Sequence, residues 1–550
     1  MLSDPLRIFI DCDTLKLWIE KIMRLQPLLE NWIVISGASV VFPPLGLLLL
    51  WVRPRTRITR KLVSSMFIVV IGVFYLRFLF GLRIELDGTG ISPRISFYKR
   101  ERHYARLEEN RAQQKQMALL PAPAELQAQP PPTASHPPIP VNSQAQLALS
   151  VIPASDPKIV TPGKKPNYWT DFRGPRRDGR YDEMAVLPEW PPQGPALLWR
   201  QPVGGGYASF VVAEGKAFTI EQRRAQEVVA AYELQTGKEL WAHAWEGEFR
   251  ESMGGDGPRA TPTWEGGHVY ALGAQGELRC LDANTGKLIW NKNILADNQA
   301  QNLTWGMAAS PLIVDDKVIV LPGGPSGKSV VAYNKLTGQA VWKVLDDKQA
   351  YTSPVLVTLN GRRQLLVVSA QRAMGLDPEA GSLLWDFPWT TEYGINSAQP
   401  LIVSEDTFFI SAGYGHGSAL IEVKPASPGF KVRAVWQSTS MKNKFSSSVL
   451  YQGHIYGMDE AILTCIDAAT GERKWKGGRY GYGQLLLAGS SLIILSEYGE
   501  LALVKATPEK HIQVASLPAL DGKTWNNPAI ADGYLLVRNT TEMACFRISR

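Results

Sequence analysis

The chain has 550 residues and a formal net charge of +7 at pH 7, with 58 Lys and Arg against 51 Asp and Glu. Residues 53–116 alone carry 14 of the basic and 5 of the acidic residues, so the remainder is close to neutral. A neutral remainder lacks the basic surface that phosphate contacts require, which argues against a nucleic-acid-binding protein.

Two apolar stretches follow an N-terminal segment (residues 1–30), and each is long enough to cross a bilayer: 31–52 and 62–82. Between them, "RPRTRITRK" (53–61) carries five positive charges. The positive-inside rule predicts a cytoplasmic loop here, with both ends of a two-helix transmembrane hairpin outside. Pro43-Pro44 is expected to bend the first helix. A buried core hairpin is the alternative, and a cleaved signal peptide fits less well, because an Arg-rich loop follows the apolar run.

A charged juxtamembrane segment (83–120) comes next, and residues 98–117 within it are a candidate helix. Residues 121–166 then hold 12 prolines in 46 residues. That composition cannot build a core and predicts an extended, semi-rigid tether. These segments together predict a membrane-tethered protein.

The remaining residues (167–550) repeat one phrase. "LDANTGKLIW" (281–290) returns as "YELQTGKELW" (232–241), "YNKLTGQAVW" (333–342), "LDPEAGSLLW" (376–385) and "IDAATGERKW" (466–475). The acidic and Thr side chains suit a tight turn, Gly supplies a positive φ, and the Trp presents a large face to a neighbouring unit. The tryptophans expected between units are Trp199, Trp241, Trp290, Trp342, Trp385, Trp436 and Trp475.

These tryptophans are 39 to 52 residues apart, which is the spacing typical of four-stranded propeller blades. Eight first strands can be counted, and the eighth unit has only three strands before the sequence ends. The short strand Ala196–Trp199 is expected to complete it, because ring closure removes an exposed sheet edge. The sequence thus predicts an all-β fold, an eight-bladed β-propeller closed by an N-terminal strand and preceded by the transmembrane hairpin.

The repeated phrases and "WTDFRGPRRDG" (169–179) resemble the pyrroloquinoline-quinone-like eight-bladed propellers, also described as quinoprotein alcohol dehydrogenase-like. That family includes quinone-dependent dehydrogenases and non-catalytic members, such as the propeller lipoprotein of the outer-membrane β-barrel assembly machinery. The resemblance therefore implies the fold and leaves the choice between enzyme and scaffold open.

The resemblance also implies what an enzyme of this family needs. The dehydrogenases hold the quinone between a Trp and a disulfide of adjacent cysteines, beside a calcium ion, and use an Asp as base. This chain has no adjacent cysteines, and Asp256, Glu392 and Asn396 are the only candidates for the calcium ligands and the base. These departures argue against redox catalysis.

The cysteines give no other sign of chemistry. Cys280, Cys465 and Cys545 fall on the third strands of the second, sixth and eighth units, too far apart for disulfides. Together with Cys12 they form no CxxC pair, so no metal site is predicted.

The loops that lead into the first strands (the mouth loops) are predicted to meet at one end of the ring. Nearly every loop carries an aromatic or charged group, and such a set either plugs the channel or binds a ligand or peptide. Arg259 is expected to point into the channel or to pair with Asp256. The candidate binding residues are Tyr207, Asp256, Arg259, Trp305, Tyr351, Tyr393, Asn396, Lys444, Phe445, Tyr482, Trp525 and Asn526.

The sequence therefore favours a membrane-tethered β-propeller in the periplasm, attached to the inner membrane of a Gram-negative-type bacterium. It would act without catalysis, binding envelope proteins or a small ligand at its mouth, with no cofactor firmly implied. The alternative is an oxidoreductase that uses pyrroloquinoline quinone with calcium and holds the cofactor through Arg259 and Trp305. No catalytic residue is assigned.

Overall fold

A computed structural model describes residues 32–53, 56–86, 93–119 and 169–549. The chain divides between Glu101 and Arg102 into two compact units, which are described separately. The N-terminal segment 1–30 and the Pro-rich segment 121–166 lie outside the described residues, as does Cys12.

The described part of the first unit contains three apolar helices: α3 (Trp32–Val41), α4 (Pro43–Val52) and α5 (Ile58–Phe80). The small core between them is made by Ile35, Leu50 and Ile68, one residue from each helix. A strand pair, β1 (Leu82–Leu86) with β2 (Pro93–Phe97), follows α5.

The single helix predicted over residues 31–52 is replaced by two short ones. Proline at 43 and 44 ends α3 at Val41, because proline has no N–H to donate and its ring clashes with the preceding turn. Ten residues of helix are about 15 Å long, whereas a bilayer core is about 30 Å thick. Among the described residues, α5 is the one helix long and apolar enough to cross a membrane.

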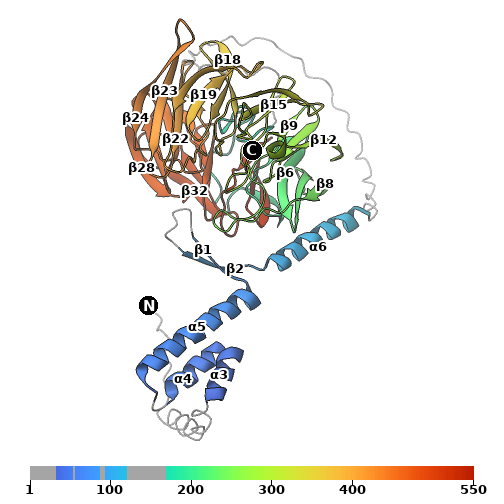
Figure 1. Ribbon diagram of the computed structural model, residues 1–550, viewed down its shortest axis with the longest axis vertical. Coiled ribbons are helices and arrows are strands. Elements are labelled where there is room, and N and C mark those ends of the chain that lie inside the picture. Colours follow the sequence, from blue (N-terminus) through green and yellow to red (C-terminus); the bar gives the residue numbers. More distant parts are fainter. Residues whose placement is uncertain (1–31, 54–55, 87–92, 120–168, 550) are drawn as a thin grey trace, which may run out of the picture. The chain divides into compact units, whose positions relative to one another are not determined.

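The second unit contains α6 (Arg100–Leu119, from Arg102 onward), as the charged pattern predicted, and a propeller. The propeller has eight blades, each an antiparallel sheet of four strands in which successive strands pair. The colours of Figure 1 follow the chain through the blades, from green through yellow to red. The predicted eight-bladed all-β fold is confirmed.

The strands of blades 1 to 4 are as follows. Blade 1 has β5 (Val211–Ala213), β6 (Lys216–Arg223), β7 (Gln226–Glu233) and β8 (Glu239–Glu246). Blade 2 has β9 (Thr263–Glu265), β10 (His268–Leu272), β11 (Glu277–Asp282) and β12 (Leu288–Asn293), followed by α7 (Ile294–Asp297). Blade 3 has β13 (Leu312–Val314), β14 (Lys317–Val320), β15 (Val330–Asn334) and β16 (Ala340–Val344). Blade 4 has β17 (Val355–Leu359), β18 (Arg362–Val368), β19 (Arg372–Leu376) and β20 (Leu383–Pro388).

The strands of blades 5 to 8 complete the ring. Blade 5 has β21 (Leu401–Ile402), β22 (Thr407–Ala412), β23 (Gly417–Pro425) and β24 (Phe430–Ser438). Blade 6 has β25 (Val449–Tyr451), β26 (His454–Asp459), β27 (Ile462–Asp467) and β28 (Arg473–Arg479). Blade 7 has β29 (Gln484–Ala488), β30 (Ser491–Leu495), β31 (Glu500–Lys505) and β32 (Gln513–Pro518). Blade 8 has β33 (Ala529–Ala531), β34 (Tyr534–Arg538) and β35 (Glu542–Arg547).

The fourth strand of blade 8 comes from the other end of the propeller sequence. Strand β4 (Ala196–Pro202) pairs antiparallel with β35, with Trp199 opposite Cys545. Strand β33 of the last blade contacts β5 of the first. A further two-residue strand, β3 (Arg180–Tyr181), pairs parallel with β29.

The repeated phrase forms the contact between blades. The indole N–H of Trp241, in blade 1, donates to the Ala283 carbonyl of blade 2 at 3.1 Å, and the ring covers Gly286. Gly286 has φ +70°, and a Cβ there would lie 2.5 Å from the indole ring. The glycine of each phrase thus serves its own turn and also receives the preceding blade's tryptophan. The same pairing joins Trp199 to Gly237, Trp290 to Gly338, Trp342 to Gly381 and Trp436 to Gly471.

Substitution Gly286→Ala tests this contact against Gly215→Ala. Both glycines have φ +70°, but nothing lies within 4 Å of a Cβ at Gly215. We expect Gly215→Ala to cost about 1 kcal/mol from backbone strain, and Gly286→Ala to cost about 2 kcal/mol more, because the indole must move. Urea unfolding of the two variants measures the difference, and equal losses would contradict the packing role.

Candidate functional site

A belt of hydrogen bonds joins the starts of the first strands around the axis of the ring. The Ser209 amide donates to Thr261 Oγ1 at 2.9 Å, and the Thr261 amide donates to Ser310 Oγ at 3.0 Å. The Ser310 amide continues the series to Ser353 Oγ at 2.9 Å, and Ser209 Oγ donates to the Asn527 carbonyl at 2.6 Å. The residues at this position of the eight blades are Ser209, Thr261, Ser310, Ser353, Gln399, Ser447, Gln484 and Asn527.

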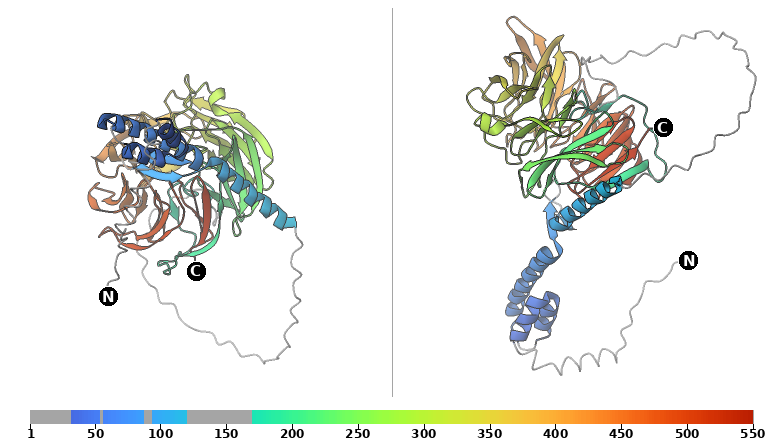
Figure 2. Two further views of the ribbon diagram at one scale, coloured as in Figure 1. Left: turned by 90° about the horizontal axis from the view of Figure 1, so that it is seen from below. Right: turned by 90° about the vertical axis from the view of Figure 1, so that its right-hand side faces the viewer.

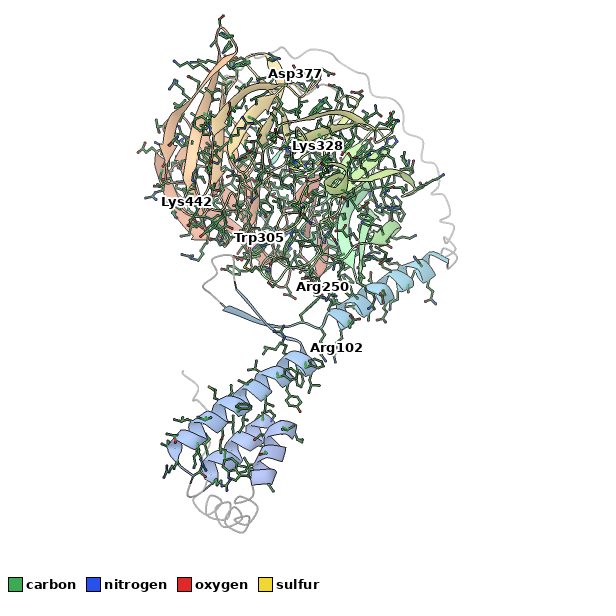
Figure 3. The ribbon with its side chains drawn as sticks, in the orientation of Figure 1. Arg102, Arg250, Trp305, Lys328, Asp377 and Lys442 are labelled. Atoms are coloured by element: carbon green, nitrogen blue, oxygen red, sulfur yellow. The ribbon has the colours of Figure 1, made fainter. Side chains whose placement is uncertain are left out.

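The mouth loops come immediately before this belt, so they surround the axis on one face of the ring, which we call the mouth face. In a four-stranded meander, the turn between the second and third strands lies on that same face. Figure 3 labels Trp305 in a mouth loop and Asp377 in a turn between third and fourth strands, which belongs to the opposite face.

The opposite end of the axis is filled by residues 169–181. Trp169 pairs with Val212 at the far end of β5, and β3 pairs with the far end of β29. Between these two points the chain crosses the ring and inserts two buried arginines, Arg173 and Arg177, which are each 2% exposed.

Arg177 binds blades 2, 3 and 4 at once, near the starts of their first strands. Its guanidinium donates to the Pro354 carbonyl at 2.9 Å, to Thr263 Oγ1 at 3.3 Å and to the Pro311 carbonyl. Buried Asp171 accepts from it at 3.3 Å. Burial lowers the pKa of Arg177, and Asp171 opposes that shift by favouring the charged form. Sequence reasoning used "WTDFRGPRRDG" only as a mark of resemblance and missed this plug, whose signal was the paired arginines.

Aromatic side chains of four mouth loops contact one another. The ring centroids of Tyr207 and Trp525 are 5.5 Å apart, those of Trp525 and Phe445 are 4.7 Å apart, and those of Phe445 and Tyr482 are 5.1 Å apart. Trp305 packs on a separate partner. These four mouth loops therefore meet, and their aromatic rings form one cluster, in which Tyr482 is buried.

Trp305 forms a separate aromatic pair with Tyr351, and their ring centroids are 5.7 Å apart. Tyr393 is 60% exposed and meets Tyr414 edge-on at 5.5 Å, at the rim. Tyr414 comes from the turn between β22 and β23, so the mouth face also uses turns that the sequence analysis did not consider.

Three cations lie against these rings. The Arg259 guanidinium is 4.7 Å from the centroid of Phe249 and 5.6 Å from that of Tyr207, and it donates to the Gly255 carbonyl at 2.6 Å. Burial lowers its pKa, and nearby Tyr207 opposes that shift. Arg259 is thus held by aromatic rings and by backbone carbonyls.

The other two cations are lysines. Lys444 Nζ lies 4.7 Å from the Tyr414 ring and 5.0 Å from the Tyr482 ring. Lys523 Nζ lies 4.3 Å from the Trp525 ring, and the sequence analysis did not select it. Cation–π contacts of this kind leave positive charge at an aromatic surface.

Two carboxylates fix the aromatic residues from outside the mouth loops. Glu497 accepts from Trp525 Nε1 at 2.9 Å and from the Tyr482 amide at 3.1 Å, while Glu460 accepts from the Tyr482 hydroxyl at 2.8 Å. Both glutamates stand in turns between second and third strands. The sequence analysis examined only the loops before first strands and therefore missed them.

Two predicted binding residues have other partners. Asn396 is 1% exposed and donates to the Ser369 carbonyl at 2.8 Å. Asn526 is fully buried and donates to the Ala208 carbonyl at 2.9 Å. Both side-chain amide N–H groups hold the backbone of the mouth loops, because a buried backbone carbonyl needs a donor.

Glu227 is a buried carboxyl group whose raised pKa would suit a catalytic acid. It is 1% exposed, and its Oε1 accepts from the Ala274 amide at 2.7 Å, which joins blade 1 to blade 2. Burial raises its pKa to about 7, and the charge of Glu277 adds to the shift. Because its carboxyl group is closed off from solvent, we assign it a structural role.

A quinone with calcium would need a slot between rings and a set of metal ligands. Phe445 and Trp525 contact each other directly, so no planar ring can lie between these two side chains. No group of three or more His, Cys, Asp or Glu within the described ranges is placed to hold a metal ion. Cys280, Cys465 and Cys545 are free buried thiols, and burial raises the pKa of each to about 12.

Comparison with known proteins agrees with the fold. Residues 225–477 match the family model described as "Outer membrane protein assembly factor BamB". This match and the eight blades confirm the predicted resemblance to the pyrroloquinoline-quinone-like propellers. BamB of Yersinia pestis is 24% identical over 50% of this chain and 70% of that protein.

Dehydrogenases of the family also match. Quinohemoprotein alcohol dehydrogenase ADH-IIG of Pseudomonas putida is 23% identical over 42% of this chain and 32% of that protein. The crystal structure of quinohemoprotein alcohol dehydrogenase from Comamonas testosteroni covers 70% of this chain and 81% of its own, with a TM-score of 0.51 and 13% identity. At that identity the likeness shows the fold alone.

The plug gives one prediction. Arg177→Met removes a buried charge from its carbonyl partners and leaves Asp171 buried, which costs about 3–5 kcal/mol of unfolding free energy. The adjacent Arg176 pairs with Asp178 and Asp182 at the surface, so Arg176→Met should cost less than about 1 kcal/mol. Urea unfolding compares the two, and a similar loss in both variants would refute the plug.

Glu227 gives a second prediction, on pH. Its folded-state pKa of about 7 lies above the ordinary 4.5, so the folded state holds the proton more tightly. Its contribution to stability is complete below about pH 4.5 and is lost as the pH rises to about 7, by about 3 kcal/mol. Glu227→Gln should remove this slope in urea unfolding at pH 5 and pH 7.5, and an unchanged slope would show that another group titrates.

Proposed function

We propose that the protein is a membrane-tethered scaffold of the cell envelope, whose ring binds a partner protein at the mouth face without catalysis. The observation that carries this proposal is the gathering of aromatic rings and cations on the mouth loops. The match of residues 225–477 to the assembly-factor model supports a binding role in the envelope.

The tether is α5. It has 23 residues, and its first turns carry Arg60 and Lys61 after Arg57. Because basic residues stay on the cytoplasmic side, this end of α5 lies inside and the residues after Phe80 lie outside. The ring is then in the periplasm, attached to the inner membrane.

The chemistry of the mouth suits a protein partner. Rigid aromatic rings supply contact area at low entropic cost, and residues of this kind dominate the binding energy of protein interfaces. Lys444 and Lys523 add positive charge to the same surface. A partner segment that combines apolar and acidic side chains complements this face.

The second candidate is a quinone-dependent oxidoreductase, which the similarity to quinoprotein dehydrogenases supports. Addition of pyrroloquinoline quinone and calcium to the purified protein tests it. A bound chromophore together with dye reduction would favour the enzyme and overturn the scaffold proposal.

The scaffold proposal predicts that mouth variants lose their partner. Trp305→Ala and Tyr393→Ala should each reduce the yield of envelope proteins cross-linked to the full-length protein in native membranes by about ten-fold, because aromatic anchors dominate such interfaces. Leu336→Ala is the control, since Leu336 is 56% exposed in a turn of the opposite face. Unfolding temperatures confirm that each variant is folded. Equal cross-linking by all three variants would contradict the proposal.

A further inference from the structure

Helix α6 has a buried face although its sequence is strongly polar. Tyr104, Leu107 and Arg111 are 4%, 1% and 6% exposed, and their spacing places them on one side of the helix. On the other side Arg106 and Glu109 are exposed, and Lys115, one turn beyond Arg111, is exposed as well. A charged helix that stood alone in solvent would leave all sides exposed, so this side is built to contact something.

The contacted surface is the junction between blades 8 and 1. Arg111 donates to Gln201 Oε1 at 2.9 Å and to the Pro202 carbonyl at 3.0 Å, both in β4 of blade 8. It also reaches Tyr232 and Glu239 of blade 1, at 3.3 Å and 3.1 Å. One side chain thus bridges the last and first blades, and Figure 2 shows α6 beside their red and green strands.

Further contacts extend along α6 on both sides of Arg111. His103 Nε2 lies 2.8 Å from the Val203 carbonyl, and Glu108 accepts from Arg224 at 2.6 Å and 3.0 Å.

At the far end, Gln114 Nε2 donates to Gln201 Oε1 at 2.6 Å, and Gln114 Oε1 accepts from the Glu239 amide at 3.0 Å. The contacts therefore cover three turns of helix. They begin beside Arg224, which lies in a turn of the mouth face between β6 and β7.

Under Arg111 lies a buried network of charges. Glu221 is fully buried, and Arg223 Nε and the Tyr232 hydroxyl donate to its Oε1 at 2.6 Å and 3.1 Å. Arg223 also binds Glu239 at 2.5 Å, and Glu239 is shared with Arg111. Burial alone would raise the pKa of Glu221, but Arg223, Arg538 and Arg111 together lower it to about 2. The carboxylate and guanidinium groups of this network are therefore charged at neutral pH. Buried charges are stable only where ordered groups of opposite charge surround them.

We propose that α6 is the joint by which the ring is mounted on the N-terminal part of the chain. The chain from α5 reaches the ring first at α6, before the Pro-rich residues 121–166. Those residues then connect one point on the ring, the end of α6, to another, Trp169. Residues 121–166 therefore run between two points of the second compact unit. The proposal does not depend on what the mouth binds or on which membrane holds α5.

Cleavage within residues 121–166 tests the joint in the full-length protein. A protease site is inserted within residues 121–166, an affinity tag is placed at the N-terminus, and the protein is cleaved in detergent under native conditions. We expect the ring fragment to stay on the tag resin through α6 alone. Release of the ring from the wild-type protein as fast as from the variant below would overturn the proposal.

The variant is Arg111→Met, matched by Lys115→Met, which removes the same charge from an exposed position one turn further along α6. Arg111→Met should release the ring about ten-fold faster than Lys115→Met, since a buried ion pair loses one partner. Leu107→Ala is a second variant that loosens the same face by packing alone. Equal release by the Arg111 and Lys115 variants contradicts the proposal, and thermal unfolding of the released ring confirms that it is intact.

Discussion

The contact between a tryptophan of one blade and a glycine of the next, which is made at five of the eight junctions, is the interaction on which the ring depends. A twisted four-stranded sheet leaves both faces to be covered, and each phrase supplies one covering group and one receiving surface. Trp241 against Gly286 shows why neither residue type can be changed alone, because the turn needs a positive φ and the indole needs the space. The ring closes only when the last blade packs on the first. Strand β4, paired with β35, completes the last blade and so allows this closure.

Packing the blades in a circle crowds eight first strands near one axis, where backbone groups cannot reach water. The belt of Ser, Thr, Gln and Asn side chains meets that need on the mouth side, and Arg177 meets it on the other. The two ends of the axis therefore carry different kinds of side chain. One is closed by the chain's own arginines, and the other presents aromatic rings with cations on them, held from behind by Glu497 and Glu460. This difference directs the functional proposal to the mouth face.

At the edge of the ring, charged residues pair with one another in a buried network instead of packing on aromatic rings. Arg111, Arg223 and Glu221 form a buried network at the junction of blades 8 and 1, the place where the two ends of the propeller sequence meet. A helix fixed at this junction contacts β4, the strand that completes blade 8, together with the neighbouring strands of blade 1. The dehydrogenases and assembly factors that match this chain share the blade repeat, and α6 lies outside the matched residues 225–477.

The sequence by itself determined the eight blades, their seven tryptophans and the positions of the mouth loops, because each follows from a local pattern repeated every 39 to 52 residues. It also indicated that Pro43-Pro44 would disturb the first apolar stretch, although only the structure divides that stretch into two helices. The tertiary structure alone decided that Asn396 and Asn526 bind backbone, that Arg177 fills the axis and that α6 contacts the ring. Except for Asn396, these contacts join residues more than 40 positions apart, many of them more than 100, and neither periodicity nor turn chemistry records which distant residues a closed ring brings together.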